Sequence, residues 1–144
     1  PVTLQTLFVD LAGALLGGYL GAMSQVVYIL LGVVGLPVFA GGKAGAGVLI
    51  GPTGGYLFGF VAGAFVIGKL MAMREKPGLV WLIGSMSLGI AVVYILGIVQ
   101  LMVVAKLDLA RAIVVGLLPP LPGDIVKIVV AALICRKVRE HIRL

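Results

Sequence analysis

The chain consists of long apolar segments that are separated by short breaks of glycine, proline or charged residues. The segments cover residues 3–16, 19–34, 53–70 and 79–101, and a shorter one runs from 124 to 135. Charged residues make up only 11% of the chain, whereas soluble domains carry about 25%. We therefore predict an all-α integral membrane protein, a compact bundle of short transmembrane helices that forms one domain over residues 1–144.

The stretch from residue 41 to residue 52 is unusually rich in glycine and holds one cation, Lys43. Its helix-breaking residues are Gly41, Gly42, Gly45, Gly47, Gly51 and Pro52. In a helix, glycine costs about 1 kcal/mol relative to alanine and proline about 3 kcal/mol, so we expect an ordered loop between two helices. Irregular backbone at membrane depth persists only where it is buried in protein or lines a cavity. This glycine-rich loop is therefore the first place to expect a binding site.

Glycines recur at every fourth position in two places, a spacing that lets membrane helices approach closely. The two series are Gly13, Gly17 and Gly21, and Gly51, Gly55, Gly59 and Gly63. The first indicates a packing face, and the second gives the third helix a nearly bare face for a partner helix or a ligand. We also expect the Gly17-Gly18 pair to break the first helix, and Pro37 to end the second segment.

The pattern changes between residues 103 and 118, where Lys106, Asp108 and Arg111 interrupt the apolar residues. This favours a helix that lies on the membrane surface or is partly embedded. A rigid break follows, formed by Pro119, Pro120, Pro122 and Gly123. The last helix is expected to begin at Asp124 and to continue into water as an amphipathic tail.

Positive charges are distributed unequally between the two sides of the predicted bundle. The turn at 69–78 carries three cations and the tail at 136–143 carries four, whereas Lys43, Lys106 and Arg111 lie on the opposite side. Cytoplasmic loops carry the excess of Lys and Arg, so we predict a multi-pass protein with a cytoplasmic C-terminus. The glycine-rich loop and the proline break then share the outer face.

Asp124 and Lys127 are one helical turn apart and so share a face of the last helix. Three interpretations are open. Asp124 could cap the helix start, or the two side chains could form an ion pair that needs no ligand. Alternatively, the carboxylate accepts N–H groups of a ligand while the ammonium binds its carbonyl or carboxylate, since ionisable groups in membranes usually face the protein interior.

Three other polar residues are candidates for a role near the same outer cavity. Tyr56 follows Gly54-Gly55 at a helix start, where it either anchors the helix at the interface or points its hydroxyl into the cavity. Gln5 lies near the outer end of the first segment and could reach the same space. Asp10 either bonds to a neighbouring helix or lies near an interface, and a functional role for it stays open.

Several classes of function are excluded by the residues present. The net charge of +6 comes from cations at helix ends, which argues against nucleic-acid binding. One cysteine, Cys135, and one histidine, His141, provide neither a disulfide nor a metal cluster. The sequence shows no catalytic triad, no paired carboxylates and no nucleotide-binding P-loop. We expect a protein that is not an enzyme and uses no cofactor or metal.

Four motifs follow one another along the chain: PVTLQTLFVDLAGALLG at 1–17, GLPVFAGG at 35–42, GPTGGYLFGF at 51–60 and LPGDIVK at 121–127. In this order they resemble the BioY family, the biotin-binding S components of prokaryotic energy-coupling-factor (ECF) transporters. The resemblance implies a membrane-embedded, high-affinity vitamin binder with six helices and an outward-facing pocket. Its partners would be biotin, a transmembrane T component and a pair of cytoplasmic ABC-type ATPases.

The resemblance also implies a set of ligand-binding residues. Asp124 and Lys127 would contact the polar ureido ring, and Lys43 is the candidate for a second charged contact, to the biotin carboxylate. The remaining candidates are Tyr56, Gly54, Gly55 and Gln5. Three alternatives stay open: an S component for another vitamin, a channel, and a structural protein whose glycine faces serve helix packing. A channel would need a continuous polar stripe, which the sequence does not show.

One departure from the family pattern concerns the beginning of the sequence. The family has a helix before the PVTLQ motif, and this sequence begins with that motif. In S components the first helix carries small residues that dock on the T component. We expect the sequence to be a portion of a longer protein whose first helix is absent here.

Overall fold

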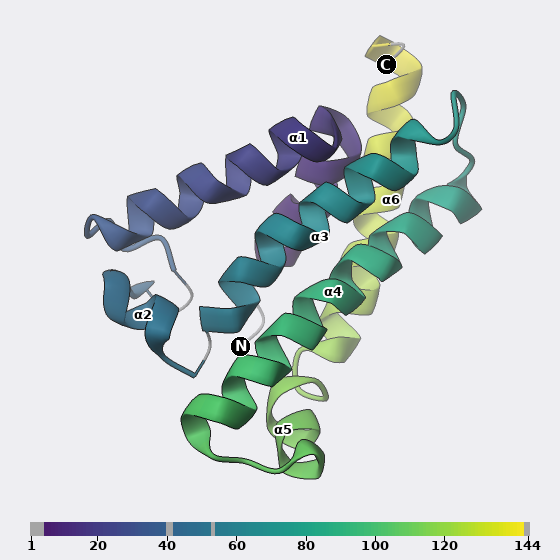
Figure 1. Cartoon of the computed structure of the whole chain (residues 1–144). Helices are drawn as coiled ribbons and strands as arrows, with labels where there is room; N and C mark the ends of the chain where they lie inside the picture. Colours follow the sequence, from purple (N-terminus) through teal and green to yellow (C-terminus); the bar gives the residue numbers. More distant parts are fainter. Residues whose placement is uncertain (1–4, 40–41, 53, 143–144) are drawn as a thin grey trace.

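The computed structural model describes residues 5–39, 42–52 and 54–142, with side chains up to residue 139. The described residues form helices and no strand, which confirms the predicted all-α fold (Figure 1). The helices are α1 (Gln5–Val33), α2 (Ala46–Ile50), α3 (Gly54–Ala72), α4 (Leu79–Ala105), α5 (Leu109–Gly116) and α6 (Leu121–Ile142). Several predicted positions lie outside the described residues, namely Thr3, Gly41, Thr53 and Arg143.

Helix α1 bends sharply at Gly17, where the sequence predicts a break. Gly17 has φ 87° and ψ 173°, a conformation that residues with a side chain rarely adopt. The first and second apolar segments therefore join in one kinked helix. Its first half lies behind α3, and its second half runs across the bundle toward α2 (Figure 1). The bend directs the beginning of α1, with its polar residues Gln5 and Thr6, into the bundle interior.

Helix α3 lies between α1 and α4, and small residues allow close approach on both sides (Figure 1). A Cβ atom at Gly59 would lie 2.7 Å from Val93 Cα, and one at Gly63 would lie 2.7 Å from the Gly89 carbonyl oxygen. On the other side, Gly13 of α1 packs on the Ala64 carbonyl. The bare glycine face of α3 therefore receives a partner helix, α4, and not a ligand.

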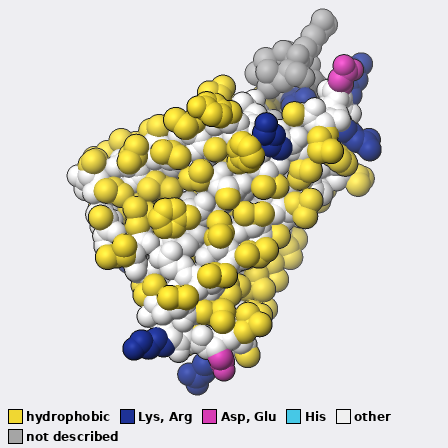
Figure 2. Space-filling model, in the orientation of Figure 1, with side chains coloured by type: hydrophobic (Ala, Val, Ile, Leu, Met, Phe, Trp, Pro, Cys, Tyr) yellow, Lys and Arg dark blue, Asp and Glu magenta, His cyan; other side chains and the backbone are white. Residues whose placement is uncertain are grey.

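The outer surface of the bundle is suited to lipid. Within the described residues, α1, α3 and α4 are each long and apolar enough to cross a membrane. Helices α5 and α6, bent by 55° at their break, meet the same criterion when taken together as one broken span. Apolar side chains cover most of the visible face, and charged side chains gather at its ends (Figure 2). This protein is a multi-pass membrane protein.

Two predicted boundaries near the C-terminal half are wrong. Residues 103–105 continue α4, so the short helix expected over 103–118 is only α5. Asp108 begins it as N-cap, with its carboxylate accepting a hydrogen bond of 2.8 Å from the Arg111 N–H. Helix α6 begins at Leu121 and not at Asp124, because proline is tolerated in a first helical turn and Pro122 lies there.

The glycine-rich loop also differs from the expectation of an uninterrupted loop, since residues 46–50 form the short helix α2.

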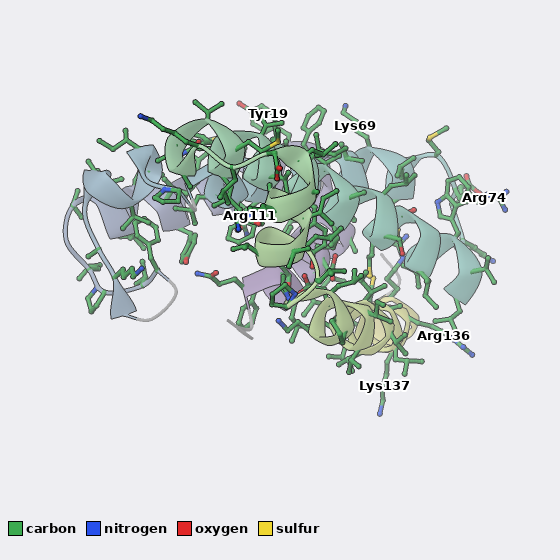
Figure 3. The ribbon with its side chains drawn as sticks, turned by 90° about the horizontal axis from the view of Figure 1, so that it is seen from below. Tyr19, Lys69, Arg74, Arg111, Arg136 and Lys137 are labelled. Carbon is green, nitrogen blue, oxygen red and sulfur yellow. The ribbon has the colours of Figure 1, made fainter. Side chains whose placement is uncertain are left out.

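Far from this loop lies a cationic end of the molecule, with Arg74 beside the α3–α4 turn and Arg136 and Lys137 on α6. These side chains point outward from the bundle, away from Arg111 of α5 (Figure 3). Arg74 stacks over the Trp81 ring at 4.6 Å.

Candidate ligand-binding site

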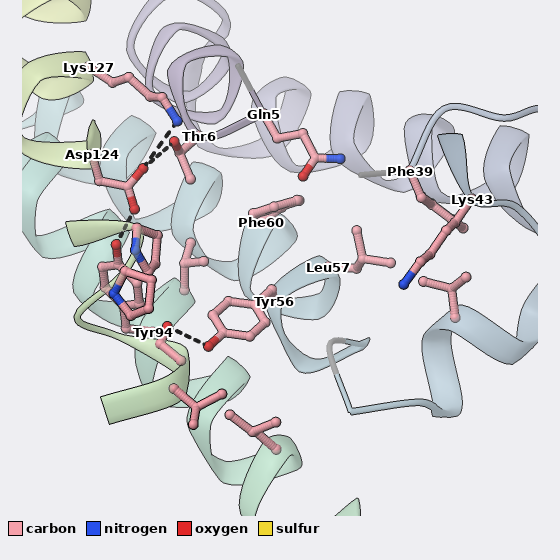
Figure 4. A pocket seen from close by; sticks show the side chains of 17 residues that line it. Gln5, Thr6, Phe39, Lys43, Tyr56, Leu57, Phe60, Tyr94, Asp124 and Lys127 are labelled. Atoms are coloured by element: carbon pink, nitrogen blue, oxygen red, sulfur yellow. Dashed lines mark hydrogen bonds and ion pairs between the residues drawn. The ribbon is translucent and has the colours of Figure 1, made fainter. Parts of the chain in front are cut away.

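A cavity of about 420 Å³ opens where α1, α3, α4, α5, α6 and the glycine-rich loop meet (Figure 4). Its volume falls within the range of about 300–1,000 Å³ of small-molecule sites. The wall is mostly apolar, with a few polar side chains. The lining residues are Gln5, Thr6, Phe39, Lys43, Val48, Tyr56, Leu57, Phe60, Val93, Tyr94, Leu101, Val115, Gly116, Pro119, Pro120, Asp124 and Lys127.

Asp124 is held in place by hydroxyl groups from two other helices. The Thr6 hydroxyl of α1 donates a hydrogen bond of 2.7 Å to Oδ1, and the Tyr94 hydroxyl of α4 donates to Oδ2. The residue is only 4% exposed. Hydrogen bonds to a charged group are stronger than those between neutral groups. The carboxylate therefore has a fixed position at the junction of α1, α4 and α6.

Lys127 forms the predicted ion pair with Asp124. Its Nζ lies 3.5 Å from Asp124 Oδ1, and the pair is largely shielded from solvent. The capping interpretation of Asp124 is wrong, because the residue lies inside the first turn of α6, where its backbone N–H donates to the Pro120 carbonyl at 2.9 Å. Both residues line the cavity, so the ion pair and a ligand contact are compatible.

Lys43 lines the cavity from the glycine-rich loop. A bridge in which the Phe39 N–H donates to the Lys43 carbonyl, at 3.1 Å, folds the loop back on itself. The buried Phe39 ring packs edge-on against Tyr28 with ring centroids 5.7 Å apart. In Figure 4, Lys43 and the Asp124–Lys127 pair lie on opposite sides of Leu57 and Phe60. The cavity thus has a charged group at each end and apolar walls between them.

Tyr56 and Gln5 also line the cavity, as the sequence predicts. The Tyr56 hydroxyl donates to the Gly116 carbonyl at 2.7 Å, which joins α3 to the end of α5. The Gln5 amide donates to the Tyr28 hydroxyl, which in turn donates to the Val38 carbonyl at 2.8 Å. Tyr56 therefore connects two helices at the cavity, and Gln5 is linked through Tyr28 to Val38 in the segment that follows α1.

Gly54 and Gly55 lie outside the cavity lining. Both are buried, with Gly54 packed on Leu49 of α2 and Gly55 packed on Leu96 of α4. Any side chain would collide with these backbones. The structure gives the pair a packing role at the beginning of α3, where it sets the position of Tyr56.

Three residues near the site were missed in the sequence: Thr6, Tyr94 and Gln100. Thr6 and Tyr94 bind Asp124, and the Gln100 amide donates to the carbonyls of Leu49 and Gly51, each at 2.7 Å. Tyr94 and Gln100 are polar side chains in a long, largely apolar segment, and Thr6 directly follows the candidate Gln5. These positions were a usable signal, because polar groups in membrane helices usually face a partner.

The arrangement is suited to binding a small molecule. Across the part of the chain that the structure describes, no group of three or more His, Cys, Asp or Glu side chains could hold a metal ion. The fixed carboxylate accepts N–H groups, and the neighbouring ammonium donates to a carbonyl or carboxylate. The apolar walls would cover a ring or an alkyl chain.

Comparisons with known proteins agree on one family. The BioY family model matches residues 1–144. The biotin transporter BioY of Thermotoga maritima is 46% identical over 140 residues, which cover 97% of this chain and 81% of that protein. The biotin transporter BioY of Rhizobium etli is 41% identical over 145 residues, or 96% of this chain and 77% of that protein.

A solved structure has the same fold. It is the 2.1 Å crystal structure of the S-component for biotin from an ECF-type ABC transporter, with a TM-score of 0.88 and 29% sequence identity. The match covers 97% of this chain and 76% of that chain. The motifs, the fold and these relatives lead to the same conclusion: the chain belongs to the BioY family.

Proposed function

We propose that this chain binds biotin in the cavity and serves as the substrate-binding S component of an ECF-type vitamin importer. The observation that carries the proposal is the buried Asp124 carboxylate, fixed by Thr6 and Tyr94 and paired with Lys127 at one end of an apolar cavity. Relatives named biotin transporters and the solved biotin S-component support the choice of ligand.

The chemistry of biotin matches the two ends of the cavity. Its ureido ring offers two N–H donors, which suit the Asp124 carboxylate, and a carbonyl, which suits the Lys127 ammonium. Its valeryl chain ends in a carboxylate, for which Lys43 at the opposite end is the candidate partner (Figure 4). The thiophane ring and alkyl chain would contact the apolar walls between, including Leu57 and Phe60.

The remaining lining residues have supporting roles in this proposal. Tyr56 and Gln5 shape the cavity through their hydrogen bonds to Gly116 and Tyr28. Gly54 and Gly55 act indirectly, by letting α3 begin close to α2 and α4.

The proposal places the protein in a larger assembly. Residues 1–144 act as a single substrate-binding domain in the cell membrane of a prokaryote, with the glycine-rich loop outside and the C-terminus in the cytoplasm. A T component and two ABC-type ATPases supply the energy for transport. The chain itself contributes binding and no catalysis.

The direct test is equilibrium binding of biotin to the purified protein in detergent, with riboflavin and thiamine as competing vitamins. We expect saturable binding of one biotin per chain and no displacement by the other two. If the folded protein bound riboflavin or thiamine but not biotin, the S-component fold would stand and biotin would be overturned as the ligand.

A further inference from the structure

Asp10 is the most unusual polar residue of the described chain. Its side chain has 0% exposure, and neither carboxyl oxygen has a hydrogen-bond partner. Within the described part of the chain, the two Asp10 carboxyl oxygens are the buried side-chain polar atoms that lack a hydrogen-bond partner. Asp124, by contrast, is also buried but binds two hydroxyls and an ammonium.

Asp10 lies beside the ligand site without lining it. It is four residues after Thr6 on α1, so both side chains project from the same face of the helix. Thr6 reaches the Asp124 carboxylate, and α1 packs directly against α6, which carries Asp124 and Lys127. The Asp10 carboxyl therefore lies behind the charged end of the cavity, one turn deeper in the bundle.

The other titratable groups on the helices around Asp10 are engaged elsewhere. From α4, Tyr94 binds Asp124, and from α3, Tyr56 binds the Gly116 carbonyl. Lys69, near the end of α3, lies 5.3 Å from the centre of the Phe65 ring. On α1 itself, Tyr28 binds Val38 and Tyr19 is exposed. Helix α6 adds the buried thiol of Cys135 and, in its last turns, the cations Arg136, Lys137 and Arg139. Asp124 and Lys127 of α6 thus determine the electrostatic environment of Asp10.

An ionised carboxylate without a hydrogen-bond donor in such a place is strongly destabilising. A second negative charge near Asp124 would add repulsion. A protonated Asp10 avoids both penalties. We propose that Asp10 is a proton-binding site, and that its bound proton keeps the Asp124–Lys127 pair in the state that accepts ligand.

This inference rests on the proposed function, through the charge of the ligand. With Asp10 neutral, the charges of Asp124, Lys127 and Lys43 sum to one positive charge, which an anionic ligand such as biotin neutralises. If Asp10 lost its proton, the occupied site would carry a net negative charge in a low-dielectric environment. Ionised Asp10 would also compete with the ligand for the Lys127 ammonium. Deprotonation should therefore weaken biotin binding.

The test compares biotin affinity of the parent and of Asp10→Asn from about pH 6 to about pH 9, where the biotin carboxylate stays ionised. At pH values where Asp10 loses its proton in the ligand-free parent, biotin affinity should fall by about tenfold per pH unit. The slope should be markedly smaller in Asp10→Asn. In the same pH range, titration calorimetry in two buffers of different ionisation enthalpy should show that the parent takes up a proton when it binds biotin. Asp10→Asn should take up none.

A second measurement needs no ligand. The folded parent would hold one more proton than its unfolded chain, in which Asp10 is ionised, so its stability should fall as pH rises. Asp10→Leu removes the carboxyl, and its melting temperature should fall less steeply with pH. Equal pH slopes for the parent and both variants, in affinity and in melting temperature, would overturn the proton site. Failure of the folded parent to bind biotin at any pH would instead overturn the proposed function.

Discussion

The two ends of the cavity are built in different ways. The anchored end, formed by Thr6, Tyr94, Asp124 and Lys127, draws its residues from three long helices and is joined by hydrogen bonds and an ion pair. The loop end, formed by Phe39, Lys43 and Val48, belongs to the segment between α1 and α3. Helix α2 in that segment buries none of its residues.

This difference indicates that the two ends have different roles in ligand binding. Groups held by helix packing are preorganised, and preorganisation favours affinity because little freedom is lost on binding. The loop end is attached to the helices by a few hydrogen bonds: from Tyr28 to Val38, from the Gly45 N–H to the Gly32 carbonyl at 2.7 Å, and from Gln100 to Leu49 and Gly51. Gly42 and Gly45 there have positive φ values of 73° and 96°. The anchored end should therefore set specificity, and the loop end should control ligand entry and exit.

The largest effect should follow Asp124→Asn at the anchored end. The change removes an acceptor of ligand N–H groups and leaves the Lys127 ammonium without its counterion. We expect biotin binding to weaken by about 3 kcal/mol, or on the order of 100-fold. Equilibrium binding would measure it, with Asp108→Asn as the matched control because asparagine also caps helices well. An unchanged affinity would remove Asp124 from the proposed site.

Tyr94→Phe should have a smaller effect at the same end. It deletes one hydroxyl donor to Asp124 and keeps the ring, so the carboxylate becomes less fixed. Affinity should fall by about 1.5 kcal/mol, roughly tenfold. Tyr19→Phe is the matched control, because Tyr19 is 73% exposed and distant from the cavity lining. Equal losses in the two variants would show that the hydroxyl bond to Asp124 does not support binding.

Gln100→Leu should loosen the loop end without touching the anchored end. It removes both hydrogen bonds to the last turn of α2, and we expect biotin to dissociate about tenfold faster, equivalent to about 1.4 kcal/mol. Amide hydrogen exchange over residues 42–52 should accelerate in parallel. Gln100→Glu keeps the side-chain size but places an acceptor against two carbonyls, so its effect should be larger. Unchanged amide hydrogen exchange in both variants would show that Gln100 does not hold the loop end in place.

The smallest effect should follow Lys43→Gln. Lys43 is exposed, and charge pairs in contact with water contribute at most about 1 kcal/mol, or fivefold in affinity. The loss should shrink at high salt, because salt screens exposed charges. Lys76→Gln, on an exposed turn outside the cavity, should leave affinity unchanged. A loss that exceeds the one from Asp124→Asn would reverse the assignment of the two ends.

The features that depend on the spacing of nearby residues could be predicted from the sequence. The apolar segments predicted the helices, the glycine pair predicted the bend at Gly17, and the three-residue spacing predicted the Asp124–Lys127 pair. Lys43, Tyr56 and Gln5 line the cavity as expected, whereas Gly54 and Gly55 pack against neighbouring backbone. Whether any of them contacts ligand stays a prediction.

What the sequence did not reveal depends on packing between distant segments. Thr6 and Tyr94 lie 118 and 30 residues from Asp124 along the chain, so no local pattern connects them. The start of α6 was predicted too late because prolines were interpreted as a break, although the first turn tolerates them. Gln100 acts on the loop from a helix end 49 residues away from Gly51.

The central claim is that the two ends of the cavity bind opposite ends of biotin. The most direct measurement is the affinity of the parent, Asp124→Asn and Lys43→Gln for biotin and for biotin amide, which lacks the carboxylate charge. Asp124→Asn should weaken both ligands by a similar factor, and Lys43→Gln should weaken biotin alone. If Asp124→Asn acted on biotin alone, or if Lys43→Gln weakened both ligands alike, the assignment of the two ends would be contradicted.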